Sequence, residues 1–156
     1  MGHFVTGLIG SPPLLERFAK ERKLHSPRPL IDGFAILALR DEDIDSFIPS
    51  PQTGHPDGFM YLSKQLMELL RDSSKDDPLM YFETEYFGGA DAQGAIVFKN
   101  GSLVFGPESS ESGPINNALR ILRIRVIPPA RDEFETVGLH RHRSTDDWIE
   151  EQNDES

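Results

Sequence analysis

Residues 81–106, YFETEYFGGADAQGAIVFKNGSLVFG, carry the strongest structural signals in the chain. Two apolar runs in the second half of this stretch are separated by Asn100 and Gly101. Asn-Gly is a preferred centre of a type I′ turn, because both residues tolerate a positive φ. The stretch therefore predicts one strand, a glycine loop and then a β-hairpin. The predicted register pairs Phe98 with Leu103, Ile96 with Phe105 and Val97 with Val104.

Two glutamates lie in the middle of the first of these strands. Side chains alternate between the two faces of a strand. One face would carry Met80, Phe82, Thr84 and Tyr86. The other face would carry Tyr81, Glu83, Glu85 and Phe87. We expect the first face to be largely core and the second to be a mixed aromatic and acidic surface.

Hydrophobic periodicity predicts further elements on either side of this stretch. A strand is expected over residues 3–10, followed by a helix with Ser11 as its N-cap. The nearly continuous apolar run at residues 33–40 predicts a strand that is covered on both faces in the centre of a sheet. A second helix is expected after an N-cap at Asp57, and a third helix is expected to begin near Pro114.

The predicted order is strand, helix, strand, helix, three strands and a helix. This order indicates a single α+β domain over residues 1–149, with about five strands in a mixed or antiparallel sheet and about three helices. Residues 150–156 are acidic and polar, and we expect them to form a disordered tail.

Composition restricts the compartment and the class of partner. The chain has 156 residues, no cysteine, and a net charge of −10 from 26 acidic and 16 basic residues. The absence of cysteine excludes disulfides and thiolate chemistry. No apolar run approaches the roughly 20 residues that span a bilayer, and the N-terminus does not have the pattern of a signal peptide. We expect a cytoplasmic protein that binds neither nucleic acid nor membranes and whose partners have basic surfaces.

Motifs that would indicate catalysis or a cofactor are weak. Gly88 and Gly89 are not followed by the lysine and hydroxyl residue of a phosphate-binding loop, and no nucleophile-elbow motif occurs. His140 and His142 would project to one side of a strand and could be joined by Asp146 or Asp147 as metal ligands. The alternating arginines of this HRHR segment would oppose a cation, so the sequence predicts no metal site and no cofactor.

Three segments resemble a known family. They are ETEYFGGADAQGA at residues 83–95, INNALRILR at residues 115–123 and DEFETVGLHRHRSTDDW at residues 132–148. They are similar to a family of small, uncharacterised bacterial proteins with an ETxYFGG…Q core and a DEF…GLxRHRxTxDW tail. The resemblance covers residues 81–148 and departs from the family at Asp91, where a small residue is usual. It implies no reaction, and by class these proteins are similar to bacterial immunity proteins, which neutralise a toxin by binding it.

The sequence therefore favours a non-enzymatic protein-binding module, in its most specific form an immunity-type inhibitor of a basic toxin. The expected contact residues are Glu83, Glu85, Tyr86, Phe87 and Asp91. One alternative is a hydrolase-like enzyme that uses Glu83 or Glu85 with His140 or His142. Another alternative is a self-associating subunit whose dimer patch includes Tyr81 and Phe87.

Overall fold

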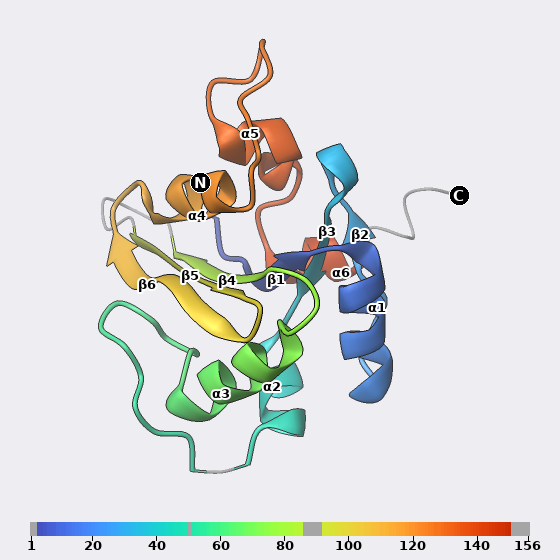
Figure 1. The fold of residues 1–156 in the computed structure, drawn as a ribbon, viewed down its shortest axis with the longest axis vertical. Helices are drawn as coiled ribbons and strands as arrows, with labels where there is room; N and C mark the ends of the chain where they lie inside the picture. The colour runs from blue at the N-terminus through green and yellow to red at the C-terminus, as the bar shows by residue number, and fades with distance from the viewer. Residues whose placement is uncertain (1–2, 50, 86–91, 151–156) are drawn as a thin grey trace.

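In the described part of the chain, six antiparallel strands form one sheet in the order β2-β3-β1-β4-β5-β6 (Figure 1). The computed structural model describes residues 3–49, 51–85 and 92–150. The strands are β1 (Thr6–Gly10), β2 (Arg28–Pro29), β3 (Ala35–Ala38), β4 (Leu79–Glu85), β5 (Ala92–Lys99) and β6 (Ser102–Ser110). The predicted α+β class is confirmed, with an antiparallel sheet that has one strand more than the approximate prediction.

Six α-helices lie within the described residues, and they cover both faces of the sheet (Figure 1). The first face packs against α1 (Pro12–Glu21), α2 (Asp41–Phe47) and α3 (Lys64–Ser73). The second face packs against α4 (Pro114–Ile121), α5 (Glu133–Val137) and α6 (Thr145–Glu150). Two 3₁₀ helices, η1 (Ile31–Gly33) and η2 (Leu139–Arg141), complete the fold. The prediction of about three helices was too low because α2, α5 and α6 have only 7, 5 and 6 residues and produce little periodic signal.

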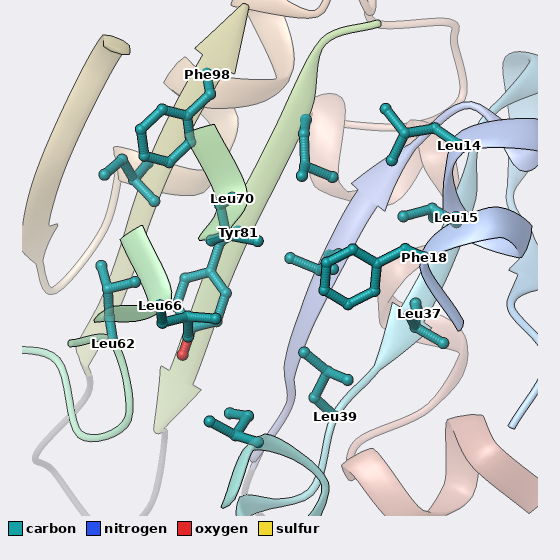
Figure 2. Packing of buried hydrophobic residues seen from close by; sticks show 14 of the residues in the cluster. Leu14, Leu15, Phe18, Leu37, Leu39, Leu62, Leu66, Leu70, Tyr81 and Phe98 are labelled. Carbon is teal, nitrogen blue, oxygen red and sulfur yellow. The ribbon is translucent and has the colours of Figure 1, made fainter. Parts of the chain in front are cut away.

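The central strands are buried on both faces, because successive side chains enter different hydrophobic clusters. In β4, Leu79 and Tyr81 belong to the cluster that includes α1 and α3, while Met80 and Phe82 belong to the cluster that includes α4 and α6. Figure 2 shows the first cluster, which contains Tyr81 and Phe98 from the sheet, Leu66 and Leu70 from α3 and Phe18 from α1. The predicted aromatic and acidic surface is therefore wrong at Tyr81 and Glu83, since both side chains are buried.

Predictions that depend on neighbouring residues are confirmed for the cap and the turn and only in part for the hairpin register. The Ser11 hydroxyl accepts a hydrogen bond from the Leu14 N–H at 3.3 Å and caps α1. Asn100 and Gly101 have φ values of 55° and 75°, as a type I′ turn requires. Phe98 pairs with Leu103, as predicted. Register shifts between Ala95 and Phe98 place Val97 opposite Phe105, so the predicted Ile96–Phe105 and Val97–Val104 pairs are wrong. A bulge of this kind adds a residue to one strand and displaces every later pair.

Predictions that depend on distant residues are partly wrong. The Asp57 cap is wrong, because α3 begins at Lys64 and its N-cap is the buried Ser63, whose hydroxyl accepts from the Leu66 N–H at 3.1 Å. The strand at residues 33–40 is covered on both faces, but it is second from the edge of the sheet, beside the two-residue β2. The expected tail begins at residue 150, which ends α6, and residues 151–156 lie outside the described residues.

The C-terminal segment is part of the core. Trp148 of α6 is fully buried in the second cluster. The Phe4 N–H donates to the Arg143 carbonyl at 2.6 Å, and the Thr145 N–H donates to the Phe4 carbonyl at 2.9 Å. Backbone hydrogen bonds therefore join the two ends of the described chain, and the start of α6 lies beside the segment that leads into β1. None of the helices within the described ranges has the length and apolar character needed to cross a membrane.

Candidate functional site

Glu83 anchors the loop that precedes α3. Its carboxylate accepts hydrogen bonds from three consecutive backbone N–H groups, those of Met60 at 2.6 Å and of Tyr61 and Leu62 at 2.9 Å each. The Tyr81 hydroxyl donates a fourth bond at 2.5 Å. Glu83 is only 6% exposed, and bonds to an ionised acceptor are stronger than those between neutral groups. The glutamate therefore lies within β4 because it satisfies the backbone of residues 60–62.

The same loop packs on the sheet where a glycine leaves room for an aromatic ring. Gly94 of β5 pairs with Glu83 of β4. A Cβ atom at Gly94 would lie 2.5 Å from the Phe59 ring, so only glycine leaves room for the ring at this position. The Ser109 hydroxyl of β6 donates to the Asp57 carbonyl at 2.9 Å. Contacts from β4, β5 and β6 thus fix the path of residues 57–62.

A pocket of about 410 Å³ lies beside this loop at one end of the sheet. Five parts of the chain form it: the start of β1, the start of α2, the loop at residues 58–61, the adjoining ends of β4 and β5, and the start of α6. Met60 and Phe4 contribute exposed apolar surface, at 55% and 45% exposure. The sheet and the Glu83 anchor therefore shape a pocket with an apolar rim.

The pocket has a strongly negative charge. Asp41, Glu42 and Glu85 line it and form no ion pair with any described residue. Among the described lining residues, Arg40 is the single cation, and the Arg40 Nε atom lies 2.5 Å from the Asp146 carboxylate. Arg40 is therefore neutralised within the chain, and the three carboxylates remain for an external cation.

Tyr61 reports the negative potential inside the pocket. Burial and the nearby charges of Asp41, Glu83 and Glu85 raise the pKa of the Tyr61 hydroxyl above its ordinary value. Asp41, Tyr61 and Glu85 all line this pocket, although 44 positions separate the two carboxylates in the sequence. The phenol stays neutral and can serve as a hydrogen-bond donor.

The hydroxyl groups of Thr84, Thr145 and Ser144, which line the pocket, have structural roles. Thr84 Oγ1 accepts from the Val5 N–H at 2.9 Å and lies 2.6 Å from His3 Nδ1. The Thr145 hydroxyl accepts from the Thr6 N–H at 3.1 Å, and the Ser144 hydroxyl accepts from the Asp147 N–H at 3.0 Å. These bonds hold the N-terminal segment between β4 and α6, so the hydroxyls are committed to the fold.

The structure brings together two of the predicted site residues, Glu83 and Glu85. Both line the pocket, but Glu83 is buried and internally bonded, while Glu85 is half-buried and forms no ion pair with a described residue. Tyr86, Phe87 and Asp91 lie outside the described residues. The dimer patch predicted at Tyr81 and Phe87 is wrong at Tyr81, which is fully buried.

The two histidines of the HRHR segment lie elsewhere. His140 lines a separate depression with Ile127 and Glu135, and the His142 ring contacts Trp148 edge-on at 4.6 Å between centroids. Neither histidine lines the pocket that contains Glu83 and Glu85. Among the described residues, no three histidine, aspartate or glutamate side chains are grouped closely enough to hold a metal ion.

Sequence reasoning missed most of the pocket. The acidic run at residues 41–45 and the apolar Phe4 and Met60 were visible, but no sequence pattern placed them beside Glu85. No protein-family model, curated protein or solved structure matches the chain. The family resemblance drawn from the motifs therefore stays a prediction.

Proposed function

We propose that this chain is a non-catalytic binding module that holds a basic protein partner at the acidic pocket. The observation that carries the proposal is that one pocket combines two exposed apolar side chains with three carboxylates that form no ion pair with a described residue. The immunity-type inhibitor expected from the sequence is the most specific form of this function, with a basic toxin as the partner.

The hydrogen bonding of Glu83 supports binding over acid–base catalysis. A general acid or base must reach the proton that it transfers, whereas the Glu83 carboxylate already accepts four bonds from within the chain. No histidine is among the described residues that line the pocket with Glu85. The hydrolase-like alternative needs these groups to converge, and their separation counts against it.

The chemistry of the pocket suits an arginine or lysine side chain from the partner. A guanidinium group can form paired hydrogen bonds with a carboxylate such as Glu85, while its aliphatic part covers Met60 or Phe4. The wider negative charge of the chain would speed the encounter with a basic surface. Hydrophobic contact at the rim would then slow dissociation.

The test compares two doubly neutralised variants. In one variant, Glu42→Gln and Glu85→Gln remove charge from the pocket. In the control variant, Glu16→Gln and Glu68→Gln remove the same charge from exposed positions on α1 and α3. Each pair changes the net charge from −10 to −10 + 2 = −8. The tagged protein is used to capture partners from native lysate, and the purified partner is then titrated by calorimetry at low and high salt.

We expect a basic partner whose affinity falls with salt and falls about tenfold in the pocket variant, which corresponds to about 1.4 kcal/mol. The control variant should bind within about twofold of the wild type. Equal losses in both variants would show that only net charge matters, and they would refute a binding role for the pocket.

A further inference from the structure

The loop between α4 and α5 presents a second charged and apolar surface. This loop, residues 122–132, forms one tip of the molecule along its longest axis (Figure 1). Ile127 is 53% exposed, and Val126 beside it is also exposed. Arg123 and Arg125 are exposed, and their guanidinium groups form no ion pair or hydrogen bond with a described residue. The tip loop therefore has the charge opposite to that of the pocket.

The tip loop is held in a defined shape. The Ile127 N–H donates to the Thr136 hydroxyl of α5 at 3.2 Å, and the Ala130 N–H donates to the Ile127 carbonyl at 3.0 Å. Arg131 pairs with Glu135 at 2.6 Å. Because these bonds already order the loop, binding through it would cause little loss of conformational entropy.

Apolar surface extends from the tip loop to η1. Ile31 of η1 is 52% exposed, and it lines with Ile127 a depression of about 410 Å³. Pro128 and Pro129 form another wall of this depression. Clustered exposed apolar side chains of this kind mark contact surfaces more often than isolated ones do.

The acidic pocket and the tip loop are complementary surfaces of one chain. The pocket combines carboxylates with exposed Phe4 and Met60, and the tip region combines arginines with exposed Ile31, Val126 and Ile127. The two surfaces share no residue. We infer that two copies of this chain associate head to tail, with the tip loop of one copy seated at the acidic pocket of the other.

This association would be weak and would compete with the basic partner for the same pocket. The net charge of −10 on each copy opposes the encounter, but charges separated by more than about 8 Å are largely screened at physiological ionic strength. The local attraction of arginine for carboxylate, together with apolar contact, then decides whether the two copies associate. A head-to-tail contact of this kind closes into a ring or extends as a chain. The inference rests on the pocket of the proposed function and adds the tip loop to it.

Sedimentation velocity of the full chain, from about 10 µM to about 1 mM, tests the inference because this range covers weak protein–protein affinities. The tip variant is Arg123→Glu with Arg125→Glu, and the pocket variant is Glu42→Arg with Glu85→Arg. The control variant reverses two exposed arginines elsewhere, Arg17→Glu with Arg71→Glu. Far-UV circular dichroism confirms that each variant is folded.

We expect concentration-dependent association of the wild type, at least tenfold weaker association of the tip and pocket variants, and wild-type behaviour in the control. An equimolar mixture of the tip and pocket variants restores a complementary pair of surfaces with the two charges reversed. Because the tip of the first variant is acidic and the pocket of the second is basic, the mixture should associate again as a pair.

A wild type that stays monomeric throughout this range would overturn the inference. So would a control variant as impaired as the tip variant, or a mixture that does not associate. These outcomes leave the proposed function intact, because that function is measured separately by the effect of Glu42→Gln and Glu85→Gln on a purified basic partner.

Discussion

Glu83 shows how one buried carboxylate can organise a loop. Its four hydrogen bonds satisfy three backbone N–H groups and one phenol, and the bonds from the Leu62 N–H and the Tyr81 hydroxyl are buried. An unsatisfied buried donor costs about 1–3 kcal/mol. The Glu83 charge also raises the pKa of the Tyr81 hydroxyl, although burial is the larger cause. Glu83 therefore stabilises the wall of the pocket that it lines.

Replacing Glu83 tests this role directly. Glu83→Gln keeps one acceptor oxygen but places an amide N–H₂ group against backbone donors, so we expect a loss of about 2 kcal/mol in the free energy of unfolding. Urea titration measures this loss. Glu85→Gln is the matched control on the same strand face and should cost less than about 0.5 kcal/mol. Similar losses in the two variants would contradict the anchoring role of Glu83.

The Gly94 position tests the seat of the Phe59 ring. A Cβ atom there would lie 2.5 Å from the ring, so Gly94→Ala must displace it. We expect a cost of about 2 kcal/mol, as for other overpacked sites. In a Phe59→Ala background the same change should be nearly neutral, because the clashing ring is gone. An equal loss of stability in both backgrounds would show that Gly94→Ala acts on β5 and not through a clash with the Phe59 ring.

One buried and one half-buried histidine, His3 and His25, predict how stability depends on pH. Burial lowers the pKa of His3, with a further contribution from the charge of Arg143, and burial lowers the pKa of His25 despite the nearby Asp43. The unfolded chain therefore binds protons more tightly than the folded chain at these sites. Their contribution to stability is complete above pH about 6.5 and is lost as the pH falls below that value.

Urea midpoints at about pH 7.5 and about pH 5.5 measure this effect, which linkage limits to about 1.4 kcal/mol per pH unit for each histidine. His3→Asn retains a polar atom near the Nδ1 position, and His25→Gln retains one near the Nε2 position. The double variant should lose less stability on acidification than the wild type. An unchanged loss would assign the pH dependence to other groups.

At the scale of elements, α6 shows that a short helix can complete a core. Its first turn is joined to Arg40 through Asp146, and the Arg28 guanidinium donates to the Trp148 and Ile149 carbonyls at 3.2 and 2.6 Å. Its buried indole packs in the second cluster. Weak periodicity gave no helix prediction for this segment, although one large buried side chain is enough to hold it in the core.

Two substitutions at Trp148 separate packing from hydrogen bonding. Trp148→Ala leaves a large cavity and should cost about 4 kcal/mol. The indole Nε1–H is buried and has no acceptor among the described residues. Trp148→Phe removes that donor and keeps most of the ring, so we expect a loss of less than about 2 kcal/mol. Thermal or urea unfolding followed by circular dichroism distinguishes the two, and equal losses would contradict the packing role.

At the scale of the whole molecule, one sheet joins two hydrophobic clusters. Each central strand supplies alternate side chains to the cluster of α1–α3 and to the cluster of α4–α6. If either helical layer detached, the apolar side chains on the face of the sheet beneath it would be exposed to water. The two clusters should therefore unfold together.

This coupling predicts a single cooperative transition. Fluorescence of Trp148, the only tryptophan, reports on the second cluster. Far-UV circular dichroism reports on the whole chain, and near-UV circular dichroism reports on the packing of aromatic side chains in both clusters. We expect the three urea curves to coincide within error, as two-state unfolding requires. Separated midpoints would show that one layer detaches before the other.

Sequence reasoning predicted the parts of the fold that depend on nearby residues. The cap at Ser11, the Asn100-Gly101 turn and the α+β class follow from local chemistry and short periodicities. The sequence also established the acidic character of the chain and drew attention to Glu83 and Glu85 as unusual strand residues. Of the pocket, it identified these two glutamates but neither the loop nor the α2 acids that complete it.

Only the tertiary structure decided what those glutamates do. Glu83 faces the N–H groups of a loop that is 21 to 23 positions away, whereas Glu85, two residues later, lines the pocket with Asp41. A strand pattern assigns both side chains to one face and cannot show what covers that face. Local sequence determines strand, turn and cap because their hydrogen bonds join near neighbours. Burial and charge at a site depend on segments that meet only when the chain folds.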